Sequence, residues 1–184
     1  MALVAEDGTG VVGAESYATI AAIDAWWAAR SHKAYAATWT ALGTPAKEGS
    51  AREAAAYLDA RYGARYRGER KTSTQGLLWP RVGPDDEDGN PTAVVGADGF
   101  DLPNLPTQLL PAMAEIAVRA ASTELAPDIG AEGLVKTHKL GDAAVTFQDA
   151  NLQTGAAAVI DRSIGILDAI MAPILRADAR WPWL

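Results

Sequence analysis

The sequence RYGARYRGERKTSTQGLLWPR, residues 61–81, concentrates positive charge and aromatic side chains in a chain that is otherwise acidic. Six of its residues are basic and one is acidic, so it carries about +5, whereas the whole 184-residue chain carries −7. Folding alone gives no reason for such a separation of charge, which favours contact with something negatively charged. The partner would be either nucleic acid or the acidic surface of another protein subunit.

Two interpretations of this basic segment differ in how they use its aromatic rings. In the first, its cations neutralise phosphates and a ring stacks against bases, as in single-strand binders. In the second, Tyr62, Tyr66 and Trp79 are core residues, and the arginines pair with acids elsewhere or across a subunit boundary. A net charge of −7 repels DNA at long range, which favours the second interpretation. The residues proposed to contact DNA or a neighbouring subunit are Arg65, Tyr66, Arg67, Arg70, Lys71 and Arg81.

Composition points away from catalysis. The chain has no Cys and only two His, which are not in a metal-ligand spacing, and it contains no nucleotide-binding or nucleophile motif. We therefore expect no enzyme activity, no cofactor and no metal. The acidic run with Asp85, Asp86 and Asp88 fails the spacing of a calcium loop and indicates a solvated loop. The first residues do not form a leader and no stretch is long enough to span a bilayer, so we expect an intracellular protein without a membrane partner.

Helical periodicity predicts a mainly α fold. Thr19 or Ser16 can cap a first helix over 19–30, with Ile20, Ile23, Trp26 and Trp27 on one face. A short helical piece follows within 31–43. Thr44 and Pro45 mark the start of a third helix, which runs to Tyr62 and ends at Gly63. Its apolar side is predicted to comprise Ala51, Ala54, Ala55, Leu58 and Tyr62.

The second half of the chain predicts two more helices and a hairpin. One helix covers 106–125, and two strands over 135–140 and 143–147 meet at Gly141-Asp142. A last helix runs from Asp161 or Ser163 to about Arg176, and Pro173 predicts a kink or an early end. The expected organisation is an N-terminal arm (1–18), a helical domain (19–176) with a long loop (80–105) and a hairpin (134–148), and an aromatic tail (177–184).

Motifs along most of the chain resemble a known family. The sequence is similar to the DnaT-like single-stranded-DNA-binding proteins of phages, which in turn resemble head–tail connector, or adaptor, subunits. The resemblance spans 4–175, and its most specific part is the string Arg-Gly-x-Arg, Thr-Gln and Trp-Pro-Arg within 67–81. Gly49 and the tail over 181–184 depart from the pattern. Further matching stretches are Val4-x-Glu6-Asp7-Gly8-Thr9-Gly10, Ala14-x-Ser16-Tyr17, Ala25–Arg30, Tyr57-Leu58-Asp59, Leu105-Pro106 and Ala172-Pro173-Ile174-Leu175.

The connector side of this resemblance implies a structural protein of the virion neck, assembled in the host cytoplasm. It would form a homo-oligomeric ring, commonly of twelve subunits, between the portal protein and a tail-side stopper or tail terminator protein, with DNA passing through the channel. Heterologous ring contacts pair different faces of neighbouring subunits, so the basic segment could meet the acidic run. The expected portal-binding residues are Ile174, Leu175, Trp181, Trp183 and Leu184. The alternative is single-stranded-DNA binding through the segment from Arg65 to Lys71.

Overall fold

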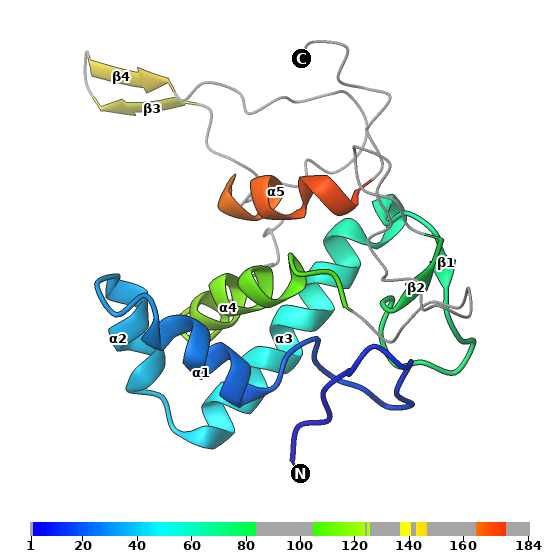
Figure 1. The fold of residues 1–184 in the computed structure, drawn as a ribbon. Helices are drawn as coiled ribbons and strands as arrows, with labels where there is room; N and C mark the ends of the chain where they lie inside the picture. The colour runs from blue at the N-terminus through cyan, green and yellow to red at the C-terminus, as the bar shows by residue number, and fades with distance from the viewer. Residues whose placement is uncertain are drawn as a thin grey trace. The chain divides into compact units, whose positions relative to one another are not determined.

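The computed structural model describes residues 2–83, 105–123, 125, 137–140, 143–146 and 165–175, with only the backbone of 137–140 and 143–146. The chain divides into two compact units, Met1–Leu125 with Ile164–Leu184, and Ala126–Ser163. The fold is mainly α with small antiparallel hairpins, which confirms the predicted class (Figure 1). Among the described residues, no helix has the length and apolar character that crossing a bilayer requires.

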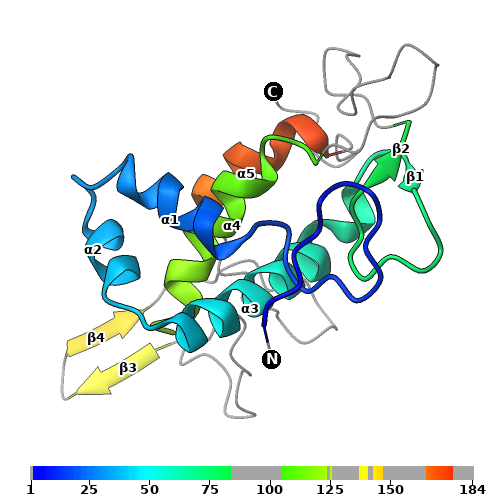
Figure 2. The same ribbon diagram turned by 60° about the horizontal axis from the view of Figure 1, so that its bottom comes forward.

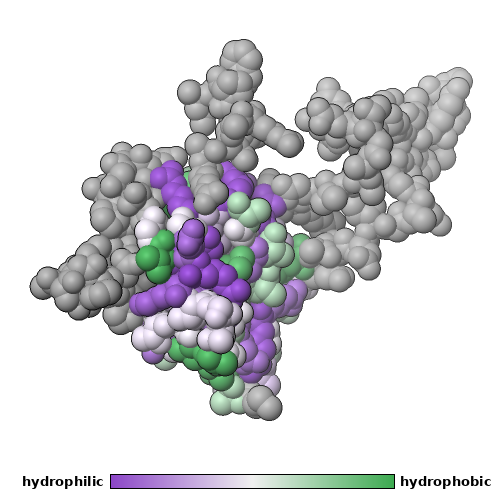
Figure 3. All heavy atoms as spheres, turned by 90° about the vertical axis from the view of Figure 1, so that its right-hand side faces the viewer, coloured by the Kyte–Doolittle hydropathy of each residue, from purple (hydrophilic) through white to green (hydrophobic). Residues whose placement is uncertain are grey.

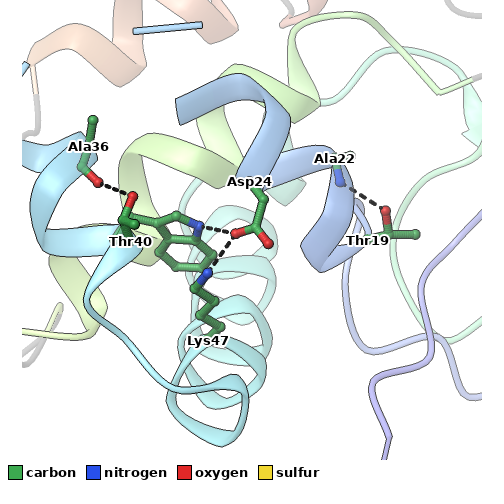
Figure 4. Close-up of polar contacts among 7 residues, drawn as sticks. Thr19, Ala22, Asp24, Ala36, Thr40 and Lys47 are labelled. Atoms are coloured by element: carbon green, nitrogen blue, oxygen red, sulfur yellow. Dashed lines mark hydrogen bonds and ion pairs between the residues drawn. The ribbon is translucent and has the colours of Figure 1, made fainter. Parts of the chain in front are cut away.

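Helices α1 (Ile20–Ala28) and α2 (Ala34–Thr40) form where the sequence predicts them. Thr19 caps α1, because its Oγ1 accepts a hydrogen bond from the backbone N–H of Ala22 at 3.2 Å (Figure 4). The predicted apolar face of α1 is confirmed, with Ile23 and Trp27 fully buried. In α2 the indole of Trp39 is buried and the ring of Tyr35 is 42% exposed.

One carboxylate joins the first three helices. Asp24 on α1 accepts hydrogen bonds from the indole Nε1 of Trp39 at 2.7 Å and from Nζ of Lys47 at 2.8 Å (Figure 4). Trp39 belongs to α2, and Lys47 belongs to α3 (Thr44–Tyr62). The contacts therefore fix the angle at which the short α2 leaves α1, and they satisfy a buried indole N–H that would otherwise cost free energy.

The core lies between α3 and α4 (Leu109–Ala120), which cross in Figure 1. All five residues predicted for the apolar side of α3 are buried. Three of them are alanines, whose small side chains let the helices approach closely and make room for larger residues of α4 such as Met113 and Ile116. Gly43, not Thr44, occupies the cap position of α3, and Pro45 lies in its first turn.

Helix α4 begins three residues later than predicted. The backbone N–H of Leu109 bonds to the carbonyl of Pro106 at 3.0 Å, so residues 106–108 form a turn that leads into the helix. Pro111 is the third residue of α4. Its missing N–H is one of the first four, which have no partner within a helix, so the proline does not interrupt α4.

Helix α5 (Gly165–Met171) confirms the effect predicted for Pro173. A 3₁₀ turn, η2 (Ala172–Ile174), replaces the α-helical bonds at the proline, and the helix ends early. α5 packs on α4 through the buried Leu167 and Met171. Its Asp168 accepts a hydrogen bond from the hydroxyl of Tyr62 at 2.7 Å and pairs with Arg61 at 3.3 Å, which ties α5 to the end of α3. The predicted start of this helix lies outside the described residues.

The N-terminal segment, predicted as an arm over 1–18, forms a loop with internal hydrogen bonds. The buried carboxylate of Glu6 accepts hydrogen bonds from the backbone N–H groups of Gly8, Gly10 and Val11 at 2.8–3.0 Å. The loop formed in this way lies beside strands β1 (Glu69–Arg70) and β2 (Arg81–Val82) (Figure 2), and the carbonyl of Val11 accepts the N–H of Gly76 at 3.1 Å. Because the carboxylate of Glu6 satisfies three backbone N–H groups, the segment can be buried as part of the first unit.

The second unit contains the predicted hairpin. Strands β3 (Thr137–Leu140) and β4 (Ala143–Thr146) pair antiparallel, with Leu140 opposite Ala143. This register leaves two residues, Gly141 and Asp142, between the strands, as the turn signal predicts.

Candidate nucleic-acid interface

The basic segment folds into a loop closed by a very short sheet. After α3 the chain makes a 3₁₀ turn, η1 (Gly63–Arg65), and then pairs β1 (Glu69–Arg70) with β2 (Arg81–Val82). The N–H of Lys71 extends this pairing by donating to the carbonyl of Pro80 at 3.1 Å. The ten residues between the strands, 71–80, therefore form a closed loop.

Two polar side chains hold this loop in shape. The Oε1 atom of Gln75 accepts the N–H of Thr72 at 2.8 Å, and the Oγ1 atom of Thr72 accepts the N–H of Gln75 at 3.1 Å. The Nε2 atom of Gln75 donates to the carbonyls of Leu77 and Pro80 at 2.8 and 3.0 Å. Gln75 is buried, so these bonds lie away from water and constrain the loop to one conformation.

The far end of the loop is held by a pair of residues that sequence reasoning did not assign to the site. The hydroxyl of Tyr17 donates to Oδ1 of Asp59 and accepts the N–H groups of Leu78 and Trp79 at 3.1 and 3.2 Å. Oδ2 of Asp59 also accepts the N–H of Leu78, at 3.0 Å. Burial raises the pKa of Asp59, although its hydrogen bonds act in the opposite direction, and burial beside Asp59 strongly raises the pKa of Tyr17.

Four cations of the segment form hydrogen bonds with backbone carbonyls, whereas Arg61 pairs with Asp168. Arg81 donates to the carbonyls of Arg67 and Gly68, and Arg67 donates from Nε to the carbonyl of Leu175 at 2.8 Å. Arg70 donates to the carbonyl of Gln75, and Nζ of Lys71 lies 3.4 Å from the carbonyl of Gly8. A carbonyl has no net charge, so these bonds orient the cations without cancelling their charge.

The rings of the segment belong to the core. Tyr62, Tyr66 and Trp79 are each at most 1% exposed, and Tyr66 meets Trp79 edge-on with their ring centroids 5.8 Å apart. The interpretation in which these aromatics are core residues is therefore confirmed. The stacking role suggested for Tyr66 requires an exposed ring, and in this fold that ring has no free surface.

The cations remain at the surface while the rings do not. Arg70 is exposed, and Arg65, Arg67, Lys71 and Arg81 are partly exposed. Figure 3 faces the side of the first unit that carries β1 and β2, and hydrophilic side chains gather across its centre. The arrangement can bind anions but, within this segment, it cannot stack bases.

Two of the five predicted portal-binding residues lie within the described residues, and both are buried. Ile174 and Leu175 are 1% and 3% exposed, and Leu175 forms a β-bridge with Tyr66. Their side chains pack inside the first unit, so neither offers a free apolar surface in this fold, and their role in portal binding stays a prediction. Trp181, Trp183 and Leu184, and the acidic residues Asp85, Asp86 and Asp88, lie outside the described residues.

The residues that sequence reasoning missed share no local pattern. Tyr17 and Asp59 are 42 positions apart. Each stands in a stretch that matches the family, but neither stretch indicates that the two side chains pair. Gln75 belongs to the Thr-Gln part of the family string, which marked the position without indicating a role. Among the described residues, no group of three or more acidic or histidine side chains could hold a metal ion.

Comparison with known proteins places the chain in a family. Residues 1–181 match the model of the family described as "Putative DnaT-like ssDNA binding protein", and the chain belongs to this family. No curated protein and no solved structure matches the chain.

Proposed function

We propose that this protein binds single-stranded DNA through the phosphate backbone, at the loop between β1 and β2. The observation that carries the proposal is the placement of Arg70 and Lys71 at the start of that loop. Arg70 is exposed and Lys71 partly exposed, and their hydrogen bonds within the described residues go to carbonyl oxygens. The family description supports the same activity.

The internal bonds of the loop favour binding without rearrangement. Gln75 and Thr72 hold the loop from within, and Tyr17 with Asp59 holds its far end. Cations on a preorganised loop lose less conformational freedom when they bind phosphates. Because the rings of the segment are buried, contact goes to the sugar–phosphate backbone, and we expect little dependence on base sequence.

Nearby acids limit how strong the binding is. Glu69 is exposed on β1 beside Arg70, and Lys71 lies near enough to Asp7 to lower the pKa of that carboxyl, although its hydrogen bonds to Thr9 lower it more. The chain as a whole carries −7. We therefore expect affinity that is weak at physiological salt and rises steeply as salt is removed.

The experiment is a salt titration of binding to a fluorescent 20-nucleotide thymidine oligonucleotide. The double variant Arg70→Gln, Lys71→Gln removes two charges but keeps N–H donors for the two carbonyls, and we expect it to reduce the slope of log K against log salt by about 1.4, at ~0.7 per phosphate contact. The matched control Arg70→Lys, Lys71→Arg keeps both charges and should bind like the wild type. Glu69→Gln should strengthen binding. An unchanged slope in the double glutamine variant would contradict the proposal.

A second candidate function is the connector ring, which two observations favour. The basic segment carries about +5 in a chain of −7, which suits contacts between unlike faces of identical subunits. The burial of Tyr66 removes the stacking ring that a single-strand binder would use. In this proposal the protein forms a ring, commonly of twelve subunits, in the virion neck between a portal protein and a tail-side stopper or terminator protein.

Electron microscopy separates the connector from the DNA binder. The purified chain is mixed with the portal protein encoded by the same genome, and a ring seated on the portal supports the connector. Charge reversal at Arg67 and Arg70 should then abolish the ring if the basic segment lies at the subunit boundary. A bare portal with free chains would overturn this candidate.

A further inference from the structure

A cluster of aromatic rings and cations lies at the corner between α1 and α2, away from the basic segment. Trp26 and Trp27 meet edge-on with centroids 4.6 Å apart, and Trp27 meets Tyr35 with centroids 6.3 Å apart. Trp27 is buried, whereas Trp26 is partly exposed and Tyr35 is 42% exposed. The buried indole thus supports two rings that reach the surface.

Cations accompany both surface rings. The guanidinium of Arg30 lies 3.9 Å from the ring centroid of Trp26, and that of Arg119 lies 4.6 Å from the ring centroid of Tyr35. Arg119 also pairs with the buried Glu115 at 2.7 Å, whereas Arg30 bonds to the carbonyl of Trp26 at 3.1 Å. Lys33 is exposed on the connection between α1 and α2, and no carboxylate within the described residues pairs with it.

The corner between α1 and α2 has aromatic rings at the surface, which the basic segment lacks. The segment offers cations but buries its rings, whereas the corner offers partly exposed rings together with cations. Aromatic side chains next to cations are the combination that binds bases and phosphates of single strands. Arg30 and Lys33 supply charge complementarity to a phosphate backbone, and among the described residues the carboxylate of Glu115 is already paired with Arg119.

We infer that the α1–α2 corner is a second single-stranded-DNA contact, in which a base stacks on Tyr35 while Arg30 and Lys33 contact phosphates. The inference rests on the proposed DNA-binding function. The corner adjoins the start of α3 and the basic segment follows its end. A 19-residue helix is about 28 Å long at 1.5 Å per residue, and 20 nucleotides at about 3.4 Å each can span that distance.

The test compares three variants at position 35 for binding the same 20-nucleotide oligonucleotide. Tyr35→Ala and Tyr35→Leu remove the aromatic ring, and we expect each to weaken binding about 5-fold or more, the effect of losing one stacked base. Tyr35→Phe keeps the ring and should bind like the wild type. Tyr35 is partly exposed, so the variants should fold, which circular dichroism would verify.

A photocrosslink locates the contact directly. Thymidine is replaced by 5-bromodeoxyuridine, the complex is irradiated, and trypsin releases residues 34–47 as one peptide that contains Tyr35. DNA attached to this peptide in the wild type, and lost in Tyr35→Leu, supports the inference.

The outcomes separate the two proposals. If Arg70→Gln, Lys71→Gln weakens binding but the Tyr35 variants and the crosslink show no contact, only the corner inference fails, and the corner would then suit an acidic protein surface instead. If the Tyr35 variants weaken binding and the basic-segment variant does not, the corner is the DNA site and the basic segment is not. Absence of binding in the wild type overturns both.

Discussion

The hydroxyl of Tyr17 is predicted to be a main support of the basic loop, and Tyr17→Phe tests this by removing one oxygen. That oxygen donates to Asp59 and accepts the N–H groups of Leu78 and Trp79. In the variant, Leu78 keeps its bond to Oδ2 of Asp59, whereas the N–H of Trp79 has no other acceptor within the described residues. The substitution therefore breaks one bond to a carboxylate and leaves one backbone donor unsatisfied.

The size of the effect follows from these two losses. A hydrogen bond to a charged group contributes about 1.5–3 kcal/mol, and a buried unsatisfied N–H costs about 1–3 kcal/mol. We expect Tyr17→Phe to lower the free energy of unfolding by about 3–5 kcal/mol. For a chain of this length, that corresponds to a melting temperature about 6–20 °C lower.

The assay is urea unfolding at neutral pH followed by circular dichroism. Tyr35→Phe is the matched control, since it removes the same atom from a partly exposed ring whose hydroxyl makes no hydrogen bond among the described residues, and it should change stability by less than about 0.5 kcal/mol. If the two variants were equally stable, the hydroxyl of Tyr17 would not support the loop and the reasoning would be refuted.

Three further predictions concern charge and backbone. Burial holds the pKa of Asp59 above its value in the unfolded chain, so the free energy of unfolding should fall as pH rises from the unfolded pKa to the folded pKa. Asp59→Asn should remove this fall. If the free energy of unfolding changed with pH in the same way for both proteins between pH 3 and 7, the prediction would be contradicted. Gly49→Ala, in α3 with open space around it, should raise the free energy of unfolding by about 0.5–1 kcal/mol in urea. Gly76→Ala should lower the free energy of unfolding by more than about 1 kcal/mol, because a Cβ there would lie 2.5 Å from the carbonyl oxygen of Ala14. Urea unfolding measures both glycine variants. If Gly76→Ala left the stability unchanged, the loop would be able to shift away from the added Cβ.

The helices could be predicted because their signals are local. The cap at Thr19, the end of α3 at Gly63 and the early end of α5 at Pro173 each depend on residues within a few positions of one another. The apolar side of α3 was also predictable, since periodic spacing places those residues on one face whatever packs against it. The two-residue turn of the β3–β4 hairpin is local in the same sense.

The site depended on contacts between distant positions. Charge alone identified the basic segment, but it could not show that Tyr66 and Trp79 lie in the core while Arg70 remains outside. The burial of Leu175 follows from its bridge to Tyr66, and the support of the loop follows from Tyr17. No sequence spacing encodes these pairings.

The sequence by itself therefore determined the helical class of this protein, the ends of several helices and the position of its positive charge, since each follows from neighbouring residues. Tertiary structure alone decided which rings are buried, which cations reach the surface and how the N-terminal segment closes around Glu6. The physical reason is that burial and buried hydrogen bonds are properties of the assembled core, in which a residue meets partners that its place in the chain does not specify.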